Sequence, residues 1–147
     1  MIRVVVQSAP IDLANALAEI EASGAGGIAS FTGIVRGDNG VTALTLEHYP
    51  GMTEAALRAV AGEARTRSDL LAMTIVHRVG RMVPGDRVVF LAAAAAHRGP
   101  ALEACAFAID RLKTSAPFWK REERGDTARW VEPRATDDAA AARWDGE

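Results

Sequence analysis

The stretch RVVFLAAAAAHRGPALEACAFAIDRLK, residues 87–113, carries most of the information about the fold. It follows the tight-turn sequence Pro84-Gly85-Asp86 and begins with Val-Val-Phe, which favours a strand. Alanines alone would suit a helix, but this context predicts a buried strand over 87–96. Gly99-Pro100 then opens a helix, because proline is favoured in the first helical turn, and Pro117 ends it. The stretch therefore predicts a strand followed directly by a helix.

Shorter patterns on either side predict the remaining elements. Further helices are expected over 11–22 and 53–67, and further strands over 3–7, 28–36, 41–49, 73–80 and 130–132. Because 37–40 reads as a turn, the strand over 41–49 is expected to return beside 28–36 as a hairpin. The tail from Thr136 is either a partner-contacting helix or frayed. With no repeat or linker, residues 1–147 are expected to form one α+β domain with a mostly antiparallel sheet and about three helices.

The composition excludes several classes of protein. A net charge of -2 and a pI near 5.9 argue against a general binder of nucleic acid or membrane surfaces. The single cysteine, Cys105, excludes an intramolecular disulfide and suits a reducing cytosol. The N-terminus lacks the apolar core of a signal peptide, and the longest apolar run, 88–96, is too short to cross a bilayer. We therefore expect a soluble cytoplasmic protein.

The basic residues are unevenly chosen: fifteen arginines accompany only two lysines, Lys113 and Lys120. A lysine retained in such a sequence indicates a need for its compact, titratable amine. Lys113 extends the predicted inner stripe of the helix, which consists of Leu102, Cys105, Ala106, Ile109 and Leu112. A lysine there either reaches water or meets an anion. An ordinary solvated face and an anion site both stay open, and position favours the site.

Other basic residues fall where elements end. His97 and Arg98 precede the helix that carries Lys113, and a helix N-terminus favours bound anions. Arg36 ends the strand over 28–36. Together Arg36, His97, Arg98, Lys113 and Lys120 predict a cationic pocket for a phosphate or a carboxylate. Taken singly, however, each arginine is more often a surface ion pair, and periodicity does not prove that they converge.

Other kinds of site find little support. Three histidines and one cysteine lack the spacing of metal ligands, so neither a metal nor a cofactor is expected. No Walker loop, GxSxG or dinucleotide fingerprint is present. His77-Arg78 falls within a strand, where a structural role is favoured. Cys105 could carry sulfur as a persulfide, but its place on the apolar stripe favours a core cysteine.

Several segments also match a known pattern: FTGIVR at 31–36, LTLEHYPGMTE at 44–54, HRVG at 77–80, PGD at 84–86, AHR at 96–98, EACAFAIDRLKTSAPFWKRE at 103–122 and WVEPR at 130–134. With them the chain resembles the large, catalytic subunit of molybdopterin synthase over most of its length from Phe31 to Arg134. The run DRLKTSAPFWKRE is the most specific part of the match. The sequence departs from the pattern at Ile34, where members often carry a lysine, so one basic contact to substrate is missing or replaced.

The resemblance implies an alpha/beta-hammerhead type fold and a homodimer that forms the core of a heterotetramer. Each end would bind a small ubiquitin-like sulfur carrier whose C-terminal Gly-Gly is a thiocarboxylate. The implied enzyme is a sulfurtransferase of molybdenum cofactor biosynthesis. It converts cyclic pyranopterin monophosphate into the dithiolene of molybdopterin by two sulfur deliveries.

The resemblance also suggests roles for individual residues. By motif position Arg36, His97, Arg98, Lys113, Lys120 and Arg121 would line the pocket for substrate and carrier tail, and Arg134 would reach into the neighbouring subunit's pocket. Lys113 and Lys120 are the predicted catalytic residues, with Lys113 at the thiocarboxylate and Lys120 at the pterin. The residues alone do not order these two roles. The alternative from another class is a non-catalytic module that grips the C-terminal tail of a carrier protein.

Overall fold

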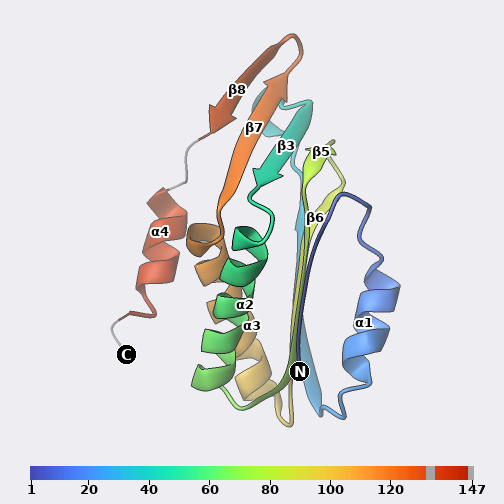
Figure 1. Ribbon diagram of the computed structural model, residues 1–147, viewed down its shortest axis with the longest axis vertical. Coiled ribbons are helices and arrows are strands. Elements are labelled where there is room, and N and C mark those ends of the chain that lie inside the picture. Colours follow the sequence, from blue (N-terminus) through green and yellow to red (C-terminus); the bar gives the residue numbers. More distant parts are fainter. Residues whose placement is uncertain (132–134, 146–147) are drawn as a thin grey trace.

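The computed structural model describes residues 1–131 and 135–145, and its centre is a four-stranded sheet with helices on both faces (Figure 1). The strands run in the order β1 (Ile2–Gln7), β4 (Leu70–Arg78), β6 (Arg87–Ala95) and β2 (Gly27–Ile34). β1 pairs with β4 in parallel, and the other pairs are antiparallel. Helices α2 (Met52–Arg67) and α3 (Arg98–Ser115) cover one face, and α1 (Leu13–Glu21) covers the other.

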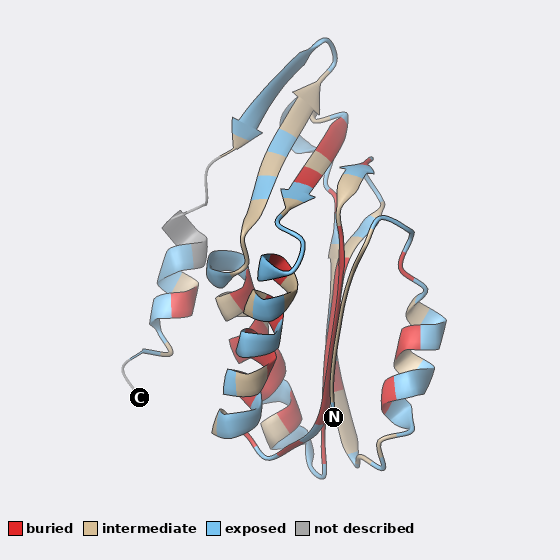
Figure 2. Cartoon of the chain, viewed as in Figure 1, coloured by how far each residue is buried: buried red, intermediate tan, exposed pale blue. Residues whose placement is uncertain are grey.

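The alanine run forms the buried strand β6, as the sequence predicts. Its side chains alternate between the two helical layers: Leu91, Ala93 and Ala95 pack with α2 and α3, whereas Ala92 and Ala94 pack with α1. All five are fully buried, and the strand is continuously buried from Val89 to Ala95 (Figure 2). Small side chains on both faces let helices approach a central strand closely, which explains why alanine, a good helix former, occupies it.

A second four-stranded sheet lies beyond the end of the first (Figure 1). It is antiparallel throughout, in the order β5 (Gly80–Met82), β3 (Ala43–His48), β7 (Phe118–Arg124) and β8 (Thr127–Val131). The predicted hairpin is therefore wrong, because β3 pairs with β5 and β7 and not with β2. The 3-10 turn η1 (Asp38–Gly40) redirects the chain into this second sheet, with Asn39 at a positive φ of 58°.

The remaining elements complete an α+β fold whose sheets are mostly antiparallel, with three substantial helices, as predicted. A short fourth helix, α4 (Ala135–Ala142), packs on α3, and beyond it Trp144 donates from Nε1 to the Asp110 carboxylate at 2.8 Å. The predicted last strand ends at Val131, and Glu132 lies outside the described residues. Within the described ranges, no helix is both long and apolar enough to cross a membrane.

Candidate active site

A cavity of about 570 Å³ opens where the C-terminal end of α3 meets the second sheet. Its lining includes the apolar side chains of Val35, Leu44, Leu46 and Phe118. Its described lining also holds five basic side chains and two carboxylates, a formal excess of three positive charges: Arg36, Lys113, Lys120, Arg124 and Arg129 against Asp38 and Glu122. A concave surface with this charge balance suits an anionic ligand.

Lys113 reaches the cavity from the last turn of α3. The predicted inner stripe is partly wrong, because Leu102 is 60% exposed and Lys113 is exposed as well. The face of α3 that packs on the sheet uses mainly small residues, which lets the helix lie close: Ala101, Ala104, Cys105, Ala108 and Leu112. Lys113 comes directly after Leu112, the last buried residue of this face, where the helix extends beyond the first sheet. Its side chain therefore meets the cavity and not the core, while the helix C-terminus favours its positive charge.

Lys120 reaches the cavity from β7, where side chains alternate between two faces. Phe118, Lys120, Glu122 and Arg124 all line the cavity. Glu122 is only 15% exposed and accepts contacts from both neighbours, at 3.9 Å from Lys120 Nζ and 3.3 Å from Arg124 Nη2. Its carboxylate therefore draws two cationic head groups together. The same alternation places Arg121, which is exposed, on the face turned away from the cavity.

Arg36 lies just beyond the end of β2, in a segment fixed by the turn before β6. The Val35 amide donates to the Asp86 carbonyl at 2.9 Å, and the Gly85 amide donates to the Val35 carbonyl at 2.9 Å. The Arg36 side chain is exposed and lies 3.4 Å from Asp38, so it can exchange this weak surface pair for a bound anion.

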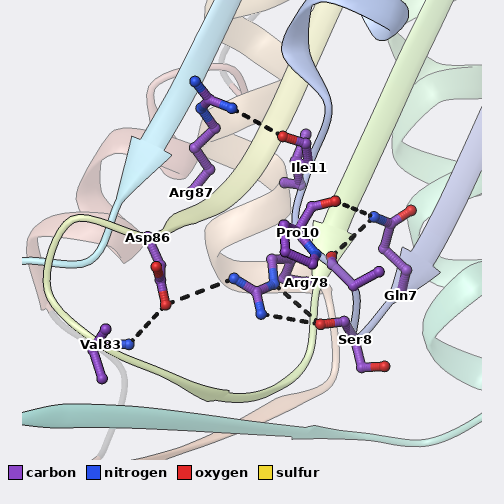
Figure 3. A network of polar contacts seen from close by, with 9 residues as sticks. Gln7, Ser8, Pro10, Ile11, Arg78, Val83, Asp86 and Arg87 are labelled. Carbon is purple, nitrogen blue, oxygen red and sulfur yellow. Dashed lines mark hydrogen bonds and ion pairs between the residues drawn. The ribbon is translucent and has the colours of Figure 1, made fainter.

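A network of polar contacts around the buried Arg78 side chain holds the turn in place (Figure 3). Arg78 donates through Nη2 to the Ser8 carbonyl at 3.0 Å and lies 3.7 Å from the Asp86 carboxylate. The same carboxylate accepts from the Val83 amide at 2.9 Å. The turn that positions the segment before Arg36 is thus tied to the end of β4 and to the loop after β1.

His77 forms part of the cavity wall although it is only 4% exposed. Its ring stacks on Phe118 with centroids 4.1 Å apart and an angle of 25°, and its Nδ1 lies 2.9 Å from the Arg78 carbonyl. Burial, assisted by the charge of Lys113, lowers the pKa of His77 to about 4 against the raising effect of that hydrogen bond. The ring is therefore neutral at physiological pH.

Sequence reasoning missed four residues of this lining: His77, Glu122, Arg124 and Arg129. For His77 the position within a strand favoured a structural role. For Glu122 and Arg124, the alternation that begins at Lys120 would have supplied the signal if β7 had been predicted as a strand. Cross-strand pairing places Arg129 opposite Glu122.

The structure does not bring every predicted site residue into this cavity. His97 occupies the N-cap position of α3, Arg98 begins the helix, and both are exposed. Because a helix rises ~1.5 Å per residue, Arg98 lies about 22 Å from Lys113, at the other end of α3. Arg134 lies outside the described residues. Within one chain, Arg36, Lys113 and Lys120 therefore line the same cavity, whereas His97 and Arg98 lie far from it.

Two other kinds of chemistry have less support from the geometry. Among the described residues, no group of three His, Cys, Asp or Glu side chains is arranged to hold a metal ion. Cys105 is buried in the core against the first sheet, and burial raises the pKa of its thiol. A thiol in that state is a poor nucleophile, which disfavours the persulfide alternative.

Comparison with known proteins gives one consistent result. The family model described as MoaE protein matches residues 6–115. The molybdopterin synthase catalytic subunit of Escherichia coli K12 is 52% identical over 131 residues, which is 87% of this chain and 86% of the relative. That of Pseudomonas aeruginosa is 48% identical, covering 95% of this chain and 97% of the relative. The solved molybdopterin biosynthesis MoaE protein of Burkholderia ambifaria superposes with a TM-score of 0.87 at 48% identity, covering all of both chains. By sequence and by structure, the chain belongs to the MoaE family.

Proposed function

We propose that this chain is the catalytic subunit of a molybdopterin synthase. The enzyme transfers sulfur from a thiocarboxylated carrier protein to cyclic pyranopterin monophosphate and so forms the dithiolene of molybdopterin. Curated relatives that match nearly the whole chain have this name. The observation that carries the proposal is the cationic cavity in which both lysines of the chain meet Arg36. The proposal places the enzyme in the cytoplasm, where a thiocarboxylate is not exposed to oxidising conditions.

The electrostatics of the cavity suit both reactants. The cyclic phosphate of the substrate and the terminal thiocarboxylate of the carrier are anions, and the cavity has a formal excess of three positive charges. Bringing two anions into contact requires cations on both, because their mutual repulsion would otherwise oppose the approach. Once carrier and substrate fill the cavity and displace water, each of these interactions is expected to strengthen.

The two lysines take different parts in this scheme. Lys113, at the exposed end of α3, contacts the thiocarboxylate of the carrier tail. There it stabilises the negative charge or donates a proton. Lys120, held near Glu122, binds substrate and stabilises the oxygen that leaves with the phosphate. Arg36 orients the phosphate through its planar pair of donors.

His97 and Arg98 join the site only from another copy of the chain. They lie too far from Lys113 within one copy, so their predicted contact with substrate requires a homodimer in which the N-terminus of one α3 approaches the cavity of the partner. The carrier then binds each cavity from outside, which gives a heterotetramer. Arg134 belongs to this intersubunit group by motif position, whereas Arg121 points away from the cavity of its own chain.

The proposal is tested by reconstitution. Purified chain is mixed with thiocarboxylated carrier and cyclic pyranopterin monophosphate under reducing conditions, and dithiolene is measured by mass spectrometry. Product that depends on all three components is expected. A chain that binds the carrier but yields no dithiolene is the non-catalytic tail-binding module, and this outcome would refute the proposed function.

A further inference from the structure

Arg78 and Asp86 belong to two segments that have no role in the scheme above, HRVG at 77–80 and PGD at 84–86. The fold brings the two side chains together, with Arg78 Nη1 3.7 Å from the Asp86 carboxylate (Figure 3). Arg78 is only 9% exposed, and a charge buried to this extent needs a partner. Neither residue is part of the described cavity lining. Any effect of the pair on the cavity must therefore act through other residues.

The turn that contains Asp86 holds the main chain on both sides of Arg36. Before Arg36, the Val35 amide donates to the Asp86 carbonyl at 2.9 Å, and the Val35 carbonyl accepts from another amide of the same turn at 2.9 Å. After Arg36, the ring of Pro84 packs against Gly37, where an added Cβ would lie 3.3 Å from Pro84 Cγ. The turn therefore fixes the stretch of backbone from which the exposed Arg36 side chain enters the cavity lining.

The Asp86 carboxylate anchors the turn in its own place. It accepts from the Val83 amide at 2.9 Å, which closes the turn. It also faces the Arg78 guanidinium, whose Nη2 and Nε donate to the Ser8 carbonyl at 3.0 and 3.3 Å. Because Arg78 is the last residue of β4, the ion pair connects the turn to a buried strand of the first sheet.

We propose that Arg78 and Asp86 are positioning residues for Arg36. The pair fixes the turn, the turn fixes the main chain at Arg36, and the guanidinium reaches an anion in the cavity from a constant origin. A segment that is already ordered loses little conformational entropy when its side chain binds, so the pair raises affinity without contacting the ligand. The assignment of that anion as the phosphate of cyclic pyranopterin monophosphate rests on the proposed function; the contacts that hold the turn do not.

Two matched variants separate this pair from an ordinary ion pair. Asp86→Asn keeps the size of the side chain and an acceptor for the Val83 amide, but removes the charge that faces Arg78. The control is Glu123→Gln, which removes a carboxylate that accepts from Arg81 Nε at 3.0 Å in the second sheet. Glu123 is not part of the described cavity lining.

Backbone ¹⁵N relaxation measures the effect on the segment without any ligand. The order parameter of the Arg36 amide is expected to be about 0.85 in wild type and in Glu123→Gln, and to fall below about 0.6 in Asp86→Asn. Amides in the middle of β6 are expected to keep their values in all three proteins. An unchanged order parameter at Arg36 in Asp86→Asn would overturn the proposal.

A double-mutant cycle connects the held segment to substrate. At saturating carrier, Asp86→Asn is expected to raise the KM for cyclic pyranopterin monophosphate about tenfold and to leave kcat within about threefold, because a binding contact is weakened. In the Arg36→Met background the same substitution is expected to raise KM by less than about twofold, since the residue through which the pair acts is gone. Equal rises in both backgrounds would show that the pair acts on the fold in general, which would overturn the proposal.

The two readouts also separate this proposal from the proposed function. If wild type forms no dithiolene, the proposed function fails, and the order parameter at Arg36 alone decides the positioning role. Arg78→Lys serves as a second variant if Asp86→Asn does not fold. It keeps the charge but loses the planar fork that serves the Ser8 carbonyl and the Asp86 carboxylate together. The same fall at Arg36 is expected, and an unchanged value would contradict the positioning role.

Discussion

Lys120 and Arg121 are neighbours in sequence, yet β7 directs them to opposite faces. Lys120 lines the cavity beside Glu122, and Arg121 is exposed on the other side. Replacing each with methionine, which keeps an unbranched stem and removes the charge, therefore separates the site from the general charge of the strand. We expect Lys120→Met to lower kcat for dithiolene formation by about 10²-fold or more, the typical contribution of a positioned proton donor or charge stabiliser.

The matched variant Arg121→Met is expected to stay within about threefold of wild type, as usual for an exposed side chain without a buried partner. Steady-state assays at saturating carrier measure both. Equal losses in the two variants would show that β7 acts through its total charge and not through the cavity face.

His77 also couples stability to pH. Its pKa is about 4 in the folded chain and near 6.5 when exposed, so protonation favours the unfolded state. The stability that it contributes is complete above pH 6.5 and is lost as the pH falls through 4. Converted at 1.36 kcal/mol per unit, the loss is about 3 kcal/mol. Urea unfolding of wild type and His77→Asn should show the difference in their unfolding free energies shrinking by this amount between pH 7 and pH 4; a constant difference would contradict it.

At the residue scale, the two lysines of the cavity could be predicted from the sequence, but the residues that surround them could not. The scarcity of lysine pointed to Lys113 and Lys120, and both line the cavity. His77 and Glu122 could not be found in this way. Their roles depend on stacking and cross-strand register, which are set by tertiary pairing and leave no trace in local composition.

At the scale of elements, strands with apolar patterns were predictable and the charged one was not. β6 follows a turn and begins with β-branched and aromatic residues, which outweighed its alanines. β7 reads FWKREER and lacks an apolar face, so its strand form depends on pairing with β3 and β8. The wrong prediction of a hairpin has the same origin, because β5 and β7, the strands with which β3 pairs, both lie far along the chain.

The junction where β2 starts beside α3 provides a stability test. A Cβ added at Gly26 would lie 2.2 Å from the Ala96 carbonyl oxygen, which is backbone between β6 and α3. We expect Gly26→Ala to cost more than about 2 kcal/mol of unfolding free energy, because the main chain must shift.

The control is Gly62→Ala, within α2, where a Cβ meets nothing within 4 Å. This substitution is expected to stabilise the chain by about 0.5–1 kcal/mol through helix propensity. Denaturant unfolding of the two variants measures both effects. A Gly26→Ala protein as stable as wild type would mean that the strand and helix meet less closely than the structure shows.

At the scale of the whole molecule, two groups of basic residues lie at opposite ends of α3. Lys113 and Arg98 stand near opposite ends, about 22 Å apart. In the proposed dimer a symmetric partner would bring the two groups into one site, and no periodicity within a single chain could reveal such an arrangement. Only the family resemblance suggested a dimer.

Mixed dimers test this arrangement. Lys113→Ala and Arg98→Ala chains are each expected to be inactive alone. If Arg98 completes the partner's cavity, refolding or exchanging the two together gives hybrids with one intact site, and activity should return to about a quarter of wild type at statistical mixing. Native mass spectrometry shows whether the hybrids have formed. If they have formed and activity does not return, Arg98 lies outside the site.

The central claim is that the lysine cavity performs the sulfur transfer, and a single-turnover experiment tests it most directly. Wild type and Lys113→Arg are each saturated with thiocarboxylated carrier, mixed with limiting cyclic pyranopterin monophosphate, and quenched for dithiolene analysis, while carrier binding is measured in parallel. We predict conversion of the substrate by wild type, and a loss of about 10²-fold in rate for Lys113→Arg with carrier affinity within a few-fold. Equal rates in the two proteins, or no dithiolene with wild type bound to its carrier, would contradict the claim.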